Sequence, residues 1–220
     1  DLPLVKLFVK SGALLDHRRD YGLANDSVFC SVDAGHLEVA KFLIETGADF
    51  TRKDGYGRNL LMIAANRAQL AAVEYFVGKG LDVNAKDMSG HTAIHLAAMG
   101  DTPECLAVVR YLINNGGNPL IKLDDGTSPL MSAALEGAVR PAKLLIENGA
   151  AVNEKNSRGE TPLFLAARGV NPPESREMTE FLIAAGAEVN ARTKAGKTPL
   201  MEASGCQDVE VLRALLDHGA

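Results

Sequence analysis

The chain has few aromatic residues and no long apolar run. Tryptophan is absent, and aromatic residues make up 5% of the 220 positions. This composition fits a core of small aliphatic side chains between closely packed helices. No apolar run approaches the roughly 20 residues that span a bilayer, and no signal peptide is visible. We therefore expect no membrane insertion.

Basic residues are outnumbered by acidic ones. The 23 Lys and Arg against 28 Asp and Glu give a formal net charge of -5. Proteins that bind nucleic acids need a basic face to displace counterions from phosphates. The charge balance therefore argues against a nucleic-acid partner.

Cysteines are few and widely spaced. Cys30, Cys105 and Cys206 fall in different parts of the chain. If helices stack about 8–10 Å apart along a repeat array, these thiols are beyond disulfide reach. An odd, dispersed set of thiols is typical of a reducing compartment, and predicts a cytoplasmic location.

Motifs for catalysis or cofactor binding are missing too. There is no phosphate-binding loop, no His-Glu-x-x-His and no Cys-x-x-Cys. His91 and His95 have a metal-like spacing, but His91 precedes the expected helix. Asp124 and Asp125 fall in a turn, where a solvated tip is the simpler interpretation. We expect no catalytic residue, metal site or cofactor.

What the chain does have is a regular repeat. A Gly-Ala-like dipeptide recurs at glycines 12, 47, 80, 116, 149, 186 and 219, with steps of 35, 33, 36, 33, 37 and 33 residues. A period near 33 is typical of a stacked solenoid rather than a single core. A solenoid offers a long surface instead of a pocket, which favours binding over catalysis.

A second landmark shows what each unit contains. The segment 92–98 (Thr-Ala-Ile-His-Leu-Ala-Ala) has counterparts at 26–32, 59–65, 128–134, 161–167 and 198–204. Each starts with a Ser, Thr, Asp or Asn that can cap a helix, and three continue with Pro at the first helical position. A second amphipathic helix, an extended piece and a glycine-containing turn follow. Each unit is thus predicted to be turn, helix, helix and extended loop.

These motifs resemble the ankyrin repeat, with its Thr-Pro-Leu-His-x-Ala helix start and its Gly-Ala-Asp-Val-Asn segment after the second helix. The resemblance implies an all-α solenoid of helix-turn-helix units with short hairpin-like loops. We expect one domain over 1–220 and a monomer. Its predicted parts are a half repeat at 1–19 and repeats at about 20–53, 54–86, 87–122, 123–155, 156–192 and 193–220.

Departures from the family pattern carry further expectations. The motif histidine, which links neighbouring loops in the family, survives only as His95. Extra residues at 100–103 and 170–173 lie between the two helices of their units, with Thr102 and Asn171 as expected caps before proline. They are either tolerated loop insertions or a paired partner contact on one edge. The missing initial Met and end caps predict a segment of a longer protein.

The resemblance places the variable residues of turns and first helices on a concave binding face. Their alternating basic, apolar and acidic zones predict an extended protein or peptide ligand, with charge complementarity fixing its register. The alternative is a scaffold or regulatory segment of a larger enzyme, channel or effector. A third hypothesis is hydroxylation of Asn84, Asn153 or Asn190. The candidate partner-binding residues are Tyr56, Arg58, Asn66, Arg67, Met88, Ser89, His91, Met99, Asp124, Asp125, Leu135, Glu136, Ser157, Arg158, Glu160, Arg168, Lys194 and Lys197, with Cys206 beside them.

Overall fold

The computed structural model describes residues 2–3, 6, 27–169, 172–206 and 208–220. Most of the expected half repeat 1–19 and the start of the first repeat lie outside this part. The expected cap Asn171 of the second insertion lies outside it as well. The prediction for these segments therefore stays a prediction.

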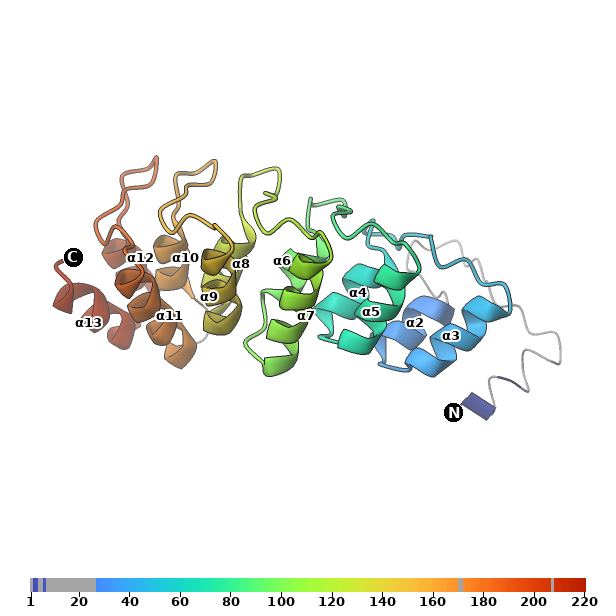
Figure 1. Ribbon diagram of the computed structural model, residues 1–220. Helices are drawn as coiled ribbons and strands as arrows, with labels where there is room; N and C mark the ends of the chain where they lie inside the picture. Colours follow the sequence, from blue (N-terminus) through green and yellow to red (C-terminus); the bar gives the residue numbers. More distant parts are fainter. Residues whose placement is uncertain (1, 4–5, 7–26, 170–171, 207) are drawn as a thin grey trace.

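Helices stack side by side in pairs along the described chain (Figure 1). No strand occurs among the described residues, which confirms the predicted all-α solenoid. The first helices of the pairs are α2 (Ser27–Asp33), α4 (Leu60–Asn66), α6 (Ala93–Ala97), α8 (Pro129–Glu136), α10 (Pro162–Arg168) and α12 (Pro199–Cys206). The second helices are α3 (Leu37–Glu45), α5 (Leu70–Gly78), α7 (Pro103–Asn114), α9 (Val139–Glu147), α11 (Pro172–Ala184) and α13 (Val209–Asp217).

Helix starts follow the capping prediction. The side chains of Asn59, Ser128 and Thr161 accept a hydrogen bond from the backbone N–H three residues on, at 2.9 to 3.2 Å. Thr102 does the same at the start of α7, with Pro103 at the first helical position. Each bond satisfies a backbone amide that has no partner within its helix, and it stabilises the fold by about 1 kcal/mol.

The core runs unbroken between the helix layers. Leu60, Leu130 and Leu163 are fully buried, and the paired alanines of α4, α8 and α10 are at most 2% exposed. Burying one such leucine stabilises the fold by about 1.5–3 kcal/mol. The small alanines let neighbouring first helices approach closely, which explains how a core poor in aromatic residues is filled.

The loops between pairs share one backbone geometry. In 87–91, the N–H of Asp87 donates to the carbonyl of His91 (3.0 Å), and the N–H of Gly90 donates back to Asp87 (3.1 Å). The same two bonds close the loops 54–58, 123–127, 156–160 and 193–197. These five loops, which we call the loop row, project from the same side of the helix stack (Figure 1). The prediction of hairpin-like loops is confirmed.

Asparagines of the extended segments connect neighbouring units. The amide of Asn84 donates to the carbonyl of Gly116 (2.9 Å), and its oxygen accepts from the N–H of Asn118 (2.8 Å). Asn153 makes the same two bonds to the unit that follows it, and the amide of Asn190 repeats the first of them. These three asparagines, predicted as hydroxylation sites, thus have their side chains in structural bonds.

The junction between the α6–α7 and α8–α9 pairs is here called the central junction. It lacks both the asparagine bonds and the backbone hydrogen bond that joins neighbouring loops at the preceding junction. Leu120 occupies the position that Asn84 holds one unit earlier, and it is 49% exposed. No backbone hydrogen bond joins loops 87–91 and 123–127, although Met88 donates to Tyr56 at the preceding junction (3.0 Å). An ion pair between Lys122 and Glu154 (2.8 Å) bridges this junction instead.

Asp101 of the first insertion and Glu174 of α11 both contact the segment where α8 ends and α9 begins. Asp101, in the first insertion, accepts from the backbone N–H of Arg140 (2.7 Å) and pairs with its guanidinium (3.2 Å). Glu174, just after the second insertion, lies against Gly137, where an added Cβ would come within 2.6 Å of it. Asp101 of the first insertion thus contacts the next unit, and the partner contact of the two insertions stays a prediction.

Candidate functional site

Each loop of the loop row is closed by the same two internal backbone hydrogen bonds. Side chains at equivalent loop positions therefore leave the backbone at equivalent places. The second loop position is Gly55, Met88, Asp124, Ser157 and Lys194 in turn. The third position is Tyr56, Ser89, Asp125, Arg158 and Ala195, and the fifth is Arg58, His91, Thr127, Glu160 and Lys197. Most of the sequence-predicted residues therefore lie on one continuous row.

Second and third loop positions point mostly into solvent. Met88 is 77% exposed and Tyr56 is 59% exposed. Ser89, Asp124, Asp125, Ser157, Arg158 and Lys194 are exposed as well. Exposed apolar side chains also occur elsewhere, as at Leu120 and Leu216, but Tyr56 and Met88 lie on adjoining loops whose backbones are hydrogen-bonded to each other. Adjoining apolar side chains on a polar surface form a small patch of the kind that can mark an interaction site.

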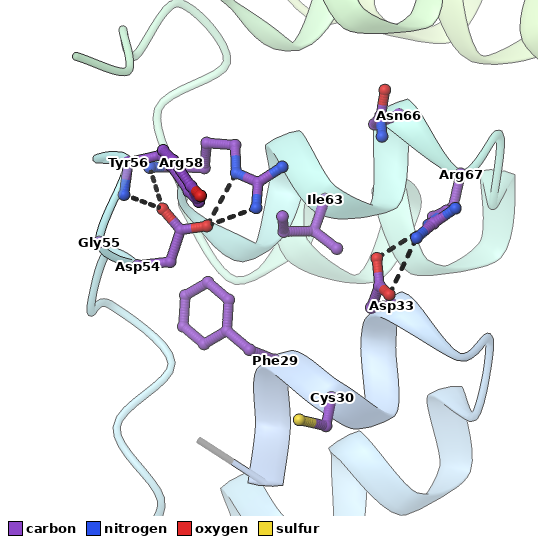
Figure 2. Close-up of a pocket in the computed structure, with 10 residues that line it drawn as sticks. All are labelled: Phe29, Cys30, Asp33, Asp54, Gly55, Tyr56, Arg58, Ile63, Asn66 and Arg67. Atoms are coloured by element: carbon purple, nitrogen blue, oxygen red, sulfur yellow. Dashed lines mark hydrogen bonds and ion pairs between the residues drawn. The ribbon is translucent and has the colours of Figure 1, made fainter. Parts of the chain in front are cut away.

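The fifth loop position is engaged within the protein. Arg58 forms an ion pair with Asp54 (2.7 Å), whose side chain is 5% exposed, and its guanidinium lies 5.2 Å from the Tyr56 ring centroid. Asp54 also accepts from the N–H groups of Tyr56 and Arg58, both at 2.9 Å. Figure 2 shows this cluster at the edge of a hollow. Arg58 thus stabilises the loop, and its charge is already neutralised.

Arg67 is neutralised in the same way. Its guanidinium makes two hydrogen bonds to Asp33, at 2.8 and 3.0 Å, and these hold the pKa of the Asp33 carboxyl below its usual value. The hollow between the two arginine pairs has a volume of about 300 Å³, with Phe29 and Ile63 among its lining residues (Figure 2). The sequence predicted a basic zone here, whereas the arginine charges are balanced by acids.

A larger charge network connects the fifth and sixth units. Arg168 forms ion pairs with both Glu160 (2.7 Å) and Glu202 (2.8 Å). Arg158 also pairs with Glu160, and Lys197 also pairs with Glu202. Burial would raise the pKa of Glu160, but hydrogen bonds from Asn156, Arg168 and Arg158 outweigh it and lower that pKa. Glu160 is only 4% exposed, so it is not a surface contact, contrary to its place among the predicted binding residues.

The histidine pair is structural as well. His91 faces Asp87 (3.2 Å), while His95 is fully buried and exchanges hydrogen bonds with Thr92 at the start of α6. Burial, followed by the nearby His91, lowers the pKa of His95 to about 4. Within the described ranges, no group of three or more His, Cys, Asp or Glu could hold a metal ion.

The remaining predicted residues lie at the ends of first helices. Asn66 and Met99 are exposed, and Leu135 and Glu136 are half-buried. Cys30 and Cys206 are exposed free thiols, whereas Cys105 is buried in α7.

Two acidic partners were missed by the sequence analysis. Asp33 and Glu202 each pair with an arginine that lies 34 positions away, Arg67 and Arg168. Opposite charges about one repeat apart were the available signal, because equivalent positions of neighbouring units lie side by side.

Comparisons with known proteins agree with this architecture. A family model described as ankyrin repeats (3 copies) matches residues 1–87, 61–156 and 141–220. A putative palmitoyltransferase, ZDHHC13, of Danio rerio is 30% identical over 174 residues, or 77% of this chain and 26% of that protein. The E3 ubiquitin-protein ligase XBAT32 of Arabidopsis thaliana is 26% identical over 194 residues, or 77% of this chain and 38% of that protein.

A human channel, transient receptor potential cation channel subfamily A member 1, is 28% identical over 140 residues, or 60% of this chain and 12% of the channel. The chain therefore spans well under half of each of these three relatives. In the part of this chain that the structure describes, no helix is long and apolar enough to cross a bilayer.

Proposed function

The chain belongs to the ankyrin-repeat family, and we propose that it is a non-enzymatic module that binds a protein or peptide through its concave face. That face consists of the loop row and the exposed ends of the first helices. The observation that carries the proposal is the exposure of Tyr56 and Met88 at the tips of adjoining loops. Aromatic and methionine side chains are favoured in protein interfaces, where they add large or adaptable apolar contact.

The chemistry of this face supports binding rather than catalysis. A general acid or base needs a titratable group that can reach a substrate. Glu160 is buried in ion pairs and His95 is fully buried, while the exposed Asp124 and Lys194 stand on loops two units apart and so form no acid–base pair. The exposed side chains of the row instead offer apolar area and charge, which are means of recognition.

Site-specific photo-crosslinking tests the proposal. A photoreactive amino acid is placed at Met88 or at Lys194, and in a control at Lys143, which is exposed on α9 in the second-helix layer. The variants are incubated with a lysate of the cells that make the protein. We expect one partner to crosslink from both loop positions and not from Lys143. Crosslinking from Lys143 alone, or equally from all three positions, would refute binding through the loop row.

A second candidate role is that of a scaffold or regulatory segment in a larger enzyme, channel or effector. It is favoured by the small share, 12% to 38%, of the named relatives that the chain covers. The sequence of the full-length transcript tests it. An attached catalytic or membrane domain would support this role, and an open reading frame confined to the repeats would exclude it.

We propose further that the module is a monomer of the cytoplasm with no nucleic-acid partner. The three thiols are free, as a reducing compartment requires. Light scattering coupled to gel filtration would test the monomer, because a dimer would double the measured mass.

A further inference from the structure

The loop row places side chains of different chemistry in a fixed order. At the second loop position the order is Met88, Asp124, Ser157 and Lys194, one unit after another. Each loop is closed by the same pair of backbone hydrogen bonds, so these side chains leave the backbone at equivalent points. The order of chemistry along the sequence is therefore an order along the surface.

Only some charges on the row are available to a ligand. Arg58, Arg158 and Lys197 each form an ion pair within the protein. In contrast, the side chains of Asp124 and Lys194 have no hydrogen bond or ion pair with any described residue, and both are exposed. A ligand that pairs with one of these three basic side chains must first break its ion pair within the protein. Pairing with Asp124 or Lys194 breaks no such ion pair.

We propose that the loop row recognises an extended peptide segment that presents an apolar, then a basic, then an acidic side chain. The apolar residue packs on Met88 and Tyr56, the basic residue pairs with Asp124, and the acidic residue pairs with Lys194. This inference rests on the proposed function, to which it adds the class and order of the ligand's residues.

The geometry also sets the spacing of the three anchors. Neighbouring helical units pack about 10 Å apart, and an extended peptide advances about 3.3 Å per residue. One unit therefore corresponds to about three ligand residues. Met88 and Asp124 are one unit apart and Asp124 and Lys194 are two units apart, so the basic residue follows the apolar one by about three positions and the acidic residue follows by about six more.

Mixed charge distinguishes this ligand from a polyanion. Asp124, in the middle of the row, is exposed and carries an unpaired negative charge, whereas its neighbour Asp125 lies 3.9 Å from Arg158. Asp124 would repel a continuous chain of phosphates or an anionic membrane, because like charges brought together in an interface are unfavourable. A peptide that alternates the sign of its charge meets no such conflict.

Selection from a peptide library, with the full chain as bait, tests the proposal. The library displays random peptides of roughly 14 residues, long enough to reach all three anchors in an extended conformation. We expect the enriched peptides to share the apolar, basic, acidic order with the spacing given above. The best peptide is then synthesised in three forms: unchanged, with its basic residue replaced by Glu, and with its acidic residue replaced by Lys.

Charge-swapped proteins assign each anchor. Asp124→Lys should weaken the unchanged peptide about tenfold and restore binding to the form with Glu, and Lys194→Glu should do the same for the form with Lys. Lys143→Glu, the matched control on α9, should leave all three affinities unchanged. Equal effects of a swap on matched and mismatched peptides would overturn the proposal.

Failure to enrich any peptide, or enriched peptides with no shared order, would also overturn it. In either of these cases the broader proposal of a protein-binding face is still tested separately by the crosslinking at Met88 and Lys194. The two proposals can therefore fail separately.

Discussion

At the scale of single residues, two glycines of the loop row show how closely neighbouring loops are packed. Gly159 and Gly196 hold the same loop position with nearly the same left-handed backbone, at φ of +76° and +78°. A Cβ added to Gly159 would lie 2.9 Å from the backbone nitrogen of Lys194, whereas one added to Gly196 would meet nothing within 4 Å. A substitution at Gly196 therefore adds backbone strain alone, whereas the same substitution at Gly159 adds both backbone strain and a steric clash with the next loop.

We predict that Gly159→Ala destabilises the protein more than Gly196→Ala. Both variants place a side chain in the left-handed region, at a cost of about 1–2 kcal/mol. Only Gly159→Ala adds a clash with the next loop, of about 1–3 kcal/mol. Urea unfolding followed by circular dichroism measures the difference. Equal unfolding midpoints for the two variants would show that neighbouring loops are not held in this contact.

The buried His95 predicts a pH dependence of stability. Its pKa is lowered to about 4 in the folded protein, while the unfolded chain has an ordinary value near 6.5. Below pH 6.5 the unfolded state takes up the proton first, so stability falls as the pH drops towards 4. The full loss is about 3 kcal/mol, because each pKa unit corresponds to 1.36 kcal/mol.

His95→Met is the matched variant, because Met62 and Met131 already occupy the equivalent buried positions. We expect the difference in unfolding free energy between wild type and this variant to change by about 3 kcal/mol between pH 7 and 4. Acidic groups such as Glu160 and Glu202 contribute equally to both proteins and cancel in this difference. A difference that is flat with pH would contradict the buried, neutral histidine.

At the scale of structural elements, the central junction departs from the repeat pattern in two ways. Leu120 stands where Asn84 makes two hydrogen bonds to the next unit. The loops on either side of the junction share no backbone bond among the described residues. Lys122, Glu154 and the Asp101–Arg140 pair connect the two sides instead.

We predict that Leu120→Asn stabilises the protein by about 1 kcal/mol. The new amide can donate to the carbonyl of Gly149 and its oxygen can accept from the N–H of Ala151, as Asn84 does one unit earlier. Little apolar burial is lost, because Leu120 is 49% exposed. Leu120→Asp is the control, since a carboxylate of the same shape cannot donate. Urea unfolding should rank Asn above Asp, and the reverse order would refute the proposed tie.

Most elements could be predicted from the sequence because their signals are local. A cap such as Thr161 followed by proline fixes a helix start within a few residues, and a glycine after the second helix fixes its end. The ion pairs of Arg67 and Arg168 could not be predicted with the same ease, because they join different units. The direction and burial of each side chain decide whether such a pair forms.

The same limit applies to the candidate site. Tyr56 and Met88 are exposed in turns, and their contact with a partner stays a prediction. Glu160 was expected on the surface, yet it is buried between two arginines, and Arg58 lies against the nearly buried Asp54. Residue type alone does not show which charges are already paired, and that pairing decides which of them a ligand can use.

At the scale of the whole molecule, the solenoid spreads its function over a surface instead of a pocket. Each unit contacts its neighbours, so substitutions on one exposed loop leave the core of distant units intact. Met88, Asp124 and Lys194 are exposed on separate loops. They can therefore be changed together without loss of the fold.

Binding through the loop row can be tested by measuring the affinity of the crosslinked partner for a triple variant by titration calorimetry. In this variant Met88→Ser, Asp124→Lys and Lys194→Glu are combined, and Lys143→Glu on α9 serves as the control. We predict that the triple variant folds normally and binds at least about tenfold more weakly, a loss of roughly 1.4 kcal/mol, while the control binds like wild type. Unchanged affinity of the triple variant would contradict the assignment of the loop row as the binding surface.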